Sequence, residues 1–148
     1  MIFYNDPGDE TGGLVFEGGL KDGVPSNGGS LTFDRYRQDQ TLQLVSIEEG
    51  ERRHVGLVVN DRPDRVLDVA SALRVRDMPA GPERDAAVVA AGAGGTRRAW
   101  LGRTDDGQVS LVLSDAGGKP RLTMGVAADG TPAVQLLDAD GKVTRALR

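Results

Sequence analysis

The sequence contains no cysteine, which excludes a disulfide framework and any metal site built on thiolates. Aromatic residues are also scarce, at 4% of the chain, whereas glycine accounts for 21 of the 148 residues. Few large side chains are therefore available to fill a core, and each glycine inside a helix costs about 1 kcal/mol relative to alanine. We expect a turn-rich β protein, whose aromatic-poor core favours burial between subunits.

Long apolar runs are missing too. No stretch of the sequence approaches the roughly 18 consecutive apolar residues of a transmembrane helix, so we expect no direct membrane span in this chain. Residues 1–6 resemble the end of a strand, and natural chains seldom begin inside an element. We therefore expect that an upstream segment has been removed.

The net charge is −4, but the charges are distributed unevenly. Residues 1–51 carry ten acids and three bases, whereas residues 52–148 carry twelve acids and fifteen bases. The bases are dispersed among acids, without the clusters and stacking aromatics of a nucleic-acid site, so we expect no nucleic-acid partner. The pattern is typical of a solvated mixed surface; the alternative is complementary charge between the halves or between subunits.

The C-terminal third is repetitive. Residues 98–120 and 121–143 match each other at a shift of 23 residues, and a third copy begins at Thr144. The shift places Asp106-Gly107 on Asp129-Gly130, and each short loop has a glycine where a type I turn with a bulge needs a positive φ. One copy of the repeat is therefore predicted to be one hairpin, with successive strands as antiparallel neighbours.

Five strands are predicted in this region, at 97–104, 108–115, 119–127, 131–138 and 142–148. Side chains alternate between the two faces of a strand, which predicts one apolar face. That face carries Leu101, Val109, Leu111, Leu113, Leu122, Met124, Val126, Val134, Leu136 and Leu147. The inserted helices, the N-terminal strands or a second subunit are the candidates to cover it.

The first two thirds contain a shorter series of strands and then a helical pattern. Strands are predicted near 1–6, 13–17, 30–34, 41–48 and 54–60, with a loop at 21–29. Apolar spacing and Pro82 at a first helical position predict one or two short helices within 64–92. The chain is treated as one β-rich domain with three parts: N-terminal strands (1–61), a helical insertion (62–95) and a hairpin meander (96–148).

Several motifs resemble catalytic or metal-binding sequences but lack essential parts. The stretch Asp138-Ala139-Asp140-Gly141 resembles the start of a calcium loop, without the further oxygen ligand and the glutamate. The glycine-rich stretch 91–96 follows a predicted helix and opens a strand, the reverse of a phosphate loop. His54 is the single histidine, and no nucleophile elbow accompanies it. We expect no catalytic residues, no metal site and no cofactor.

One irregular stretch between predicted strands concentrates hydrogen-bonding side chains around a tyrosine. Binding loops have this character, and so do ordinary strand connections. Trp100 is predicted on the more polar face of the sheet, where an exposed indole would stack on a ligand or lie under a neighbouring subunit. The candidate binding residues are Asp34, Arg35, Tyr36, Arg37, Asp39 and Trp100.

Several stretches together resemble an uncharacterised family of bacterial membrane-anchored proteins with repeated Asp-x-Asp-Gly-Lys hairpins. They are residues 3–16, residues 29–34 with the following 38–40, residues 60–64, and the terminal hairpins. The resemblance implies a longer N-terminus with a hydrophobic anchor, and therefore an extracytoplasmic location. It implies no known activity and supplies no site residues.

Together these observations predict a mainly β fold: an antiparallel meander of hairpins with a short α-helical insertion at about residues 64–92. They also predict a non-enzymatic structural or interaction module that self-associates through its apolar sheet face as a dimer or trimer. Two other functions stay open. One is a ligand-binding module, for instance for carbohydrate, and the other is a hydrolase with His54 as its base.

Overall fold

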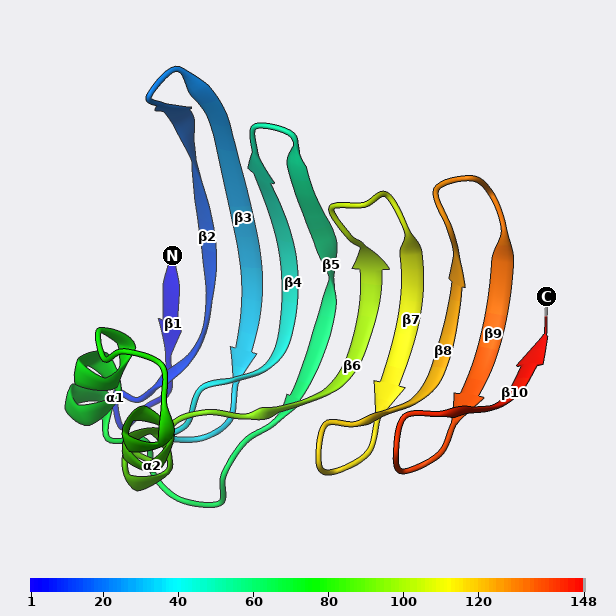
Figure 1. Cartoon of the computed structure of the whole chain (residues 1–148). Helices are drawn as coiled ribbons and strands as arrows, with labels where there is room; N and C mark the ends of the chain where they lie inside the picture. Colours follow the sequence, from blue (N-terminus) through cyan, green and yellow to red (C-terminus); the bar gives the residue numbers. More distant parts are fainter. Residues whose placement is uncertain (148) are drawn as a thin grey trace.

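The computed structural model describes residues 1–147, without the side chain of Lys21. Ten antiparallel strands form one sheet in which each strand lies beside its sequence neighbours, from β1 at one edge to β10 at the other (Figure 1). This topology confirms the mainly β fold and the meander of hairpins. The strands are β1 (Ile2–Tyr4), β2 (Glu10–Lys21), β3 (Val24–Asp34), β4 (Gln40–Glu49), β5 (Arg52–Asp61), β6 (Thr96–Arg103), β7 (Val109–Ser114), β8 (Pro120–Val126), β9 (Pro132–Leu137) and β10 (Val143–Leu147).

Two short helices interrupt the meander between β5 and β6 and confirm the predicted insertion. The first, α1 (Val69–Arg76), begins after Asp68, whose carboxylate accepts a hydrogen bond from a backbone N–H of the first turn. The second, α2 (Pro82–Ala90), begins with Pro82, where the missing N–H of proline has no cost. The helices pack against each other near the end of the sheet where β3 turns into β4 (Figure 1).

The first half contains one long hairpin where the sequence predicts a loop. Strands β2 and β3 continue through residues 21–29, and the two-residue turn Asp22-Gly23 joins them with a positive φ at both positions. Gly28 and Gly29 lie inside β3, which pairs with β2 on one side and with β4 on the other. The loop prediction was wrong because pairing on both edges outweighs the weak strand preference of glycine.

The pairing register aligns apolar side chains in rows across the sheet. Because paired residues lie on the same side and alternate residues on opposite sides, one row identifies a whole face. We call the side that carries the following row the apolar face, and the other side the opposite face. This central row takes one residue from each strand from β2 to β10: Leu14, Leu31, Leu44, Leu57, Leu101, Leu111, Met124, Val134 and Leu147.

The register confirms the apolar face predicted for the C-terminal strands and extends it into the first half. Within residues 1–147, however, neither the helices nor the N-terminal strands cover this face. Strand β5 pairs edge to edge with β6, so the first five strands widen the same sheet instead of packing over it. Large side chains of the apolar face therefore stay half-exposed, among them Leu101 at 50% and Met124 at 46%.

The hairpin turns of the C-terminal half have the predicted geometry, with a positive φ at Gly107, Gly118, Gly130 and Gly141. In the calcium-like motif, the carboxylate of Asp138 accepts hydrogen bonds from the backbone N–H groups of Asp140 and Lys142. In the matching turn one repeat earlier, the backbone N–H of Lys119 holds the pKa of Asp115 below its ordinary value. These carboxylates serve their own turns, which supports the hairpin interpretation.

Candidate functional site

The apolar face carries two shallow hollows. One, of about 400 Å³, lies over β6 to β10 and is lined by residues that include Val109, Met124 and Val126. The other, of about 600 Å³, lies over β2 to β6 and is lined by residues that include Phe16. Leu101 lines both hollows and lies between them. The face is thus hollowed as well as apolar, and both are properties of a docking surface.

The chain exposes more surface than a compact protein of its size. Its accessible surface is 9935 Å², whereas a compact monomer of 15.6 kDa exposes about 7,200 Å². The excess of about 2,700 Å² follows from a one-layer sheet with solvent on both sides. Contiguous apolar patches above a few hundred Å² mark interaction sites on soluble proteins. The apolar face is therefore the strongest candidate interaction surface among the described residues.

On the opposite face Trp100 is buried, with an exposed fraction of 5%, and the prediction of an exposed indole was wrong. The ring lies over Gly56 and Gly102: a Cβ at these positions would come within 2.4 Å and 2.6 Å of the indole, respectively. The ring of His54 stacks on it, with the two centroids 4.5 Å apart. Trp100 therefore fills a gap in its own sheet, and His54 has a packing contact with it.

The Arg35–Asp39 turn, which joins β3 to β4, contacts the start of the helical insertion. The guanidinium of Arg35 donates hydrogen bonds to the carbonyl oxygens of Arg62 and Pro63 and forms an ion pair with Asp64. Tyr36, at the tip of the turn, has an exposed fraction of 64%. The side chains of Arg35 and Asp39, two of the groups that suggested a binding loop, thus contact residues 62–64 at the start of the insertion.

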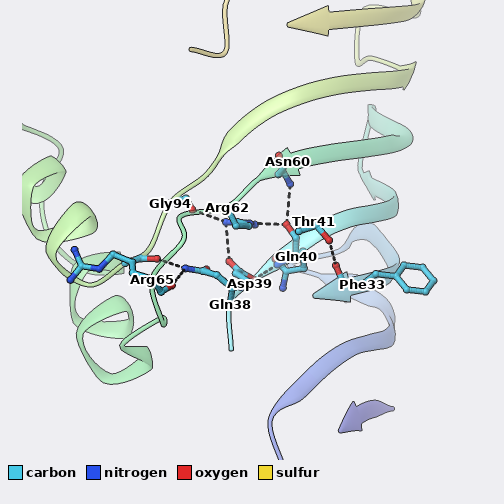
Figure 2. A network of polar contacts seen from close by, with 10 residues as sticks. Phe33, Gln38, Asp39, Gln40, Thr41, Asn60, Arg62, Arg65 and Gly94 are labelled. Carbon is cyan, nitrogen blue, oxygen red and sulfur yellow. Dashed lines mark hydrogen bonds and ion pairs between the residues drawn. The ribbon is translucent and has the colours of Figure 1, made fainter. Parts of the chain in front are cut away.

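Gln38 is the central residue of this junction, and sequence reasoning missed it. Its side chain is 7% exposed. The amide nitrogen donates hydrogen bonds to the carbonyl oxygens of Arg65, at 2.9 Å, and Gly92, at 2.7 Å, while the amide oxygen accepts one from the backbone N–H of Asp39 (Figure 2). The nitrogen and the oxygen of this buried amide both have hydrogen-bond partners, as buried polar groups usually do. Gln38 therefore ties the turn to both ends of the helical segment.

Arg62 forms the second part of the junction. Its Nε donates to the carbonyl oxygen of Gln40 at 2.7 Å, and a terminal nitrogen donates to the carbonyl oxygen of Gly94 at 3.1 Å. The same guanidinium lies 3.3 Å from the carboxylate of Asp39 (Figure 2). Arg62 therefore links β4, the turn and the segment that returns from α2 to β6.

A cavity of about 410 Å³ lies beside the turn. Burial raises the pKa of Asp34, and the carboxylates of Glu10 and Asp39 raise it further, against a smaller opposing effect of Arg62. One oxygen of Asp34 (Oδ1) is buried without a hydrogen-bond partner. The raised pKa means that the surroundings of Asp34 disfavour its ionised form. The lining of the cavity is Asp9, Glu10, Asp34, Arg37, Gln38, Asp39, Gln40, Val66, Leu67 and Val69.

The candidate binding residues therefore fall into two places. Those of the Asp34–Asp39 stretch lie together, where Arg37 has a φ of 52° and an ion pair of 3.6 Å with Asp9. Trp100 lies apart from them in the middle of the sheet, paired with Val58 of β5. No shared site is formed by Tyr36 and Trp100 in the described part of the chain.

In residues 1–147, no group of three or more His, Asp or Glu side chains is arranged to hold a metal ion. None of the helices described there is long and apolar enough to cross a membrane. The resemblance to a family of anchored bacterial proteins stays a prediction. No family model, curated protein or solved structure matches the chain.

Proposed function

We propose that this chain is a non-enzymatic structural or interaction module that self-associates through the apolar face of its sheet. The central row carries the proposal, because it presents an apolar side chain from each of nine neighbouring strands, and the described residues leave it without a second layer. Leu44, Leu101 and Met124, spread across this row, have exposed fractions of 45%, 50% and 46%. A sheet with one apolar face reaches its stable form when that face is covered.

The energetics support association. Removing apolar surface from water contributes about 25 cal/mol per Å², and association costs about 4–15 kcal/mol in lost freedom. Burial of a few hundred Å² of apolar surface on each copy therefore balances this cost. Half of the excess surface of this chain, about 1,350 Å² for one of the two faces, is larger than this area.

A ligand-binding module, for instance for carbohydrate, is the second candidate. It now rests on Tyr36 and its flanking arginine and aspartate residues, since Trp100 is buried. Tyr36 is exposed in the turn, and the next residue, Arg37, lines the cavity of about 410 Å³. Glycan-array binding that disappears in Tyr36→Ala while the fold persists would favour this candidate, and the absence of any binding by the wild-type chain would remove it.

Sedimentation velocity of a matched pair of variants tests self-association. Leu101→Lys places a charge in the middle of the apolar face and is expected to convert the associated wild-type protein to monomer with an unchanged circular dichroism spectrum. Ser110→Lys is the control, because Ser110 pairs with Gly102 on the opposite face, beside Leu101. It is expected to associate like the wild type. A folded wild-type monomer at micromolar concentration and physiological salt would contradict the proposal.

A further inference from the structure

Two copies of one sheet that pack face to face are related by a twofold axis, and this axis has two simple directions. If it runs along the strands, the strand order is reversed and β1 lies over β10 of the other copy; we call this the reversed order. If it runs across the strands, each strand lies over itself with its ends exchanged; we call this the same order. Aligned packing of twisted sheets is compatible with both.

The charges of the two halves distinguish these arrangements. Residues 1–51, which contain β1 to β4, carry ten acids and three bases, a formal charge of −7. Residues 104–148, which contain β7 to β10, carry six acids and five bases, a formal charge of −1. The same order brings the acidic halves together, and like charges oppose association. The reversed order places the acidic strands of each copy over strands of the other copy whose net charge is close to zero, so this repulsion is largely avoided.

The relief of the face agrees with the reversed order. Phe16 projects from β2 with an exposed fraction of 76%. Successive pairings give Phe16 the same height along the strands as Val126 of β8 and Pro132 of β9. Both of these residues line the hollow of about 400 Å³. Because the reversed order places β2 over β9, it brings the ring of Phe16 from each copy to the hollow of the other.

The surface area indicates an occupant as large as the face itself. Shared equally between the two faces, the excess of about 2,700 Å² gives about 1,350 Å² for the apolar face of each copy and about 2,700 Å² for two copies. Obligate homodimers bury about 2,000–5,000 Å² in total. A second copy covers the whole central row in one contact, whereas a peptide or a small ligand leaves most of the row exposed.

We infer that the partner on the apolar face is a second copy of this chain, packed as a twofold dimer in the reversed order. Strands β1 to β4 of each copy lie over β7 to β10 of the other, and β5 and β6 of both copies lie at the axis. The inference rests on the proposed self-association, and it adds the identity of the partner, the number of copies and their direction.

Cysteine cross-linking reads the order directly, because the chain has no cysteine of its own. Tyr36, in the turn between β3 and β4, and Ala116, in the turn between β7 and β8, lie at the same end of the sheet and equally far along the chain from the central row. These two turns meet between copies in the reversed order. In the other arrangement, with each strand over itself, Tyr36 meets Glu49 at the other end of β4. All three residues are exposed.

Tyr36→Cys is co-expressed with Ala116→Cys in one sample and with Glu49→Cys in a second, and both samples are treated with bismaleimidoethane. We expect cross-linked dimers in the first sample, none in the second, and sedimentation of the untreated protein at the mass of a dimer. Cross-linking in the second sample, a dimer cross-linked in neither, or a larger assembly overturns the reversed dimer but leaves self-association standing. A folded monomer overturns both proposals.

Discussion

The two faces of the sheet hold their largest side chains in different ways. On the opposite face, Trp100 lies over Gly56 and Gly102 and has an exposed fraction of 5%. On the apolar face, Leu101, the next residue along β6, has an exposed fraction of 50%. Adjacent residues of one strand thus differ tenfold in exposure, although both are apolar and both lie in the middle of the sheet.

The difference comes from the neighbours across the ladder. Trp100 is buried within one layer because glycines beside it let the ring lie against the backbone. Leu101 is paired with Leu57 and Leu111, and side chains in such a row stand away from the sheet. In such a row, neighbouring side chains cover each other laterally, but their outer ends stay exposed unless a second layer covers them. The opposite face is therefore complete at Trp100, and the apolar face needs a partner.

The largest expected effect comes from removing the buried ring. Trp100→Ala opens a cavity over two glycines and exposes the ring of His54, and we expect it to lower the free energy of unfolding by about 3–5 kcal/mol. Urea denaturation followed by circular dichroism measures this change. Leu101→Ala, its neighbour on the other face, is the matched control. With both variants made in a chain kept monomeric by Met124→Lys on the apolar face, Leu101→Ala is expected to cost about 1 kcal/mol. Equal losses in the two variants would contradict the contrast between the faces.

A smaller effect is expected from adding a methyl group on either face. A Cβ at Gly102 would lie 2.2 Å from the carbonyl oxygen of Val55 and 2.6 Å from the buried indole, so Gly102→Ala should destabilise the chain by about 1–3 kcal/mol. A Cβ at Gly29, on the apolar face, would meet the ring of Phe16 at 2.7 Å. Because Phe16 is exposed and free to rotate, Gly29→Ala should cost less than Gly102→Ala in thermal unfolding. The reverse ranking would contradict our account of how Trp100 is buried.

Much of the fold was predictable because its determinants are local. Each C-terminal turn is specified within a few residues, as in Asp106-Gly107 and Asp129-Gly130, and a period of two assigns the faces of the strands between them. The loop predicted at 21–29 was wrong for the opposite reason. Its Gly28 and Gly29 are held by pairing with β4, which lies outside any short window of sequence.

The interior contacts were not predictable in the same way. The burial of Trp100 depends on Gly56 and Gly102, which lie opposite each other in the β5–β6 pair and 46 residues apart in the sequence. Gln38 finds one of its partners, Gly92, 54 residues away.

The backbone N–H of Gln38 closes its turn onto the carbonyl of Arg35, as that of Gly107 does onto Thr104. The positive φ, however, lies at Arg37 in the first turn and at Gly107 in the second. The glycine pattern that identified the hairpin turns therefore gave no signal for Gln38.

The smallest effect on stability is expected at Asp34, beside the insertion. Here the effect comes from the charge of the carboxylate and not from apolar burial. Its pKa is raised by burial and by the carboxylates of Glu10 and Asp39, so the folded chain disfavours the ionised form. At a pH above the raised pKa of the folded chain, ionised Asp34 lowers the free energy of unfolding. This penalty decreases as the pH falls through the raised pKa and is absent below the ordinary pKa of an aspartate in the unfolded chain. Asp34→Asn, which cannot ionise, should therefore be more stable than the wild type at neutral pH. Thermal unfolding of both proteins across the acid range measures the difference in their stability. The other carboxylates titrate in both proteins, so their contribution to this difference largely cancels. A difference that grew toward low pH would show that the amide changes the cavity through hydrogen bonding and not through charge.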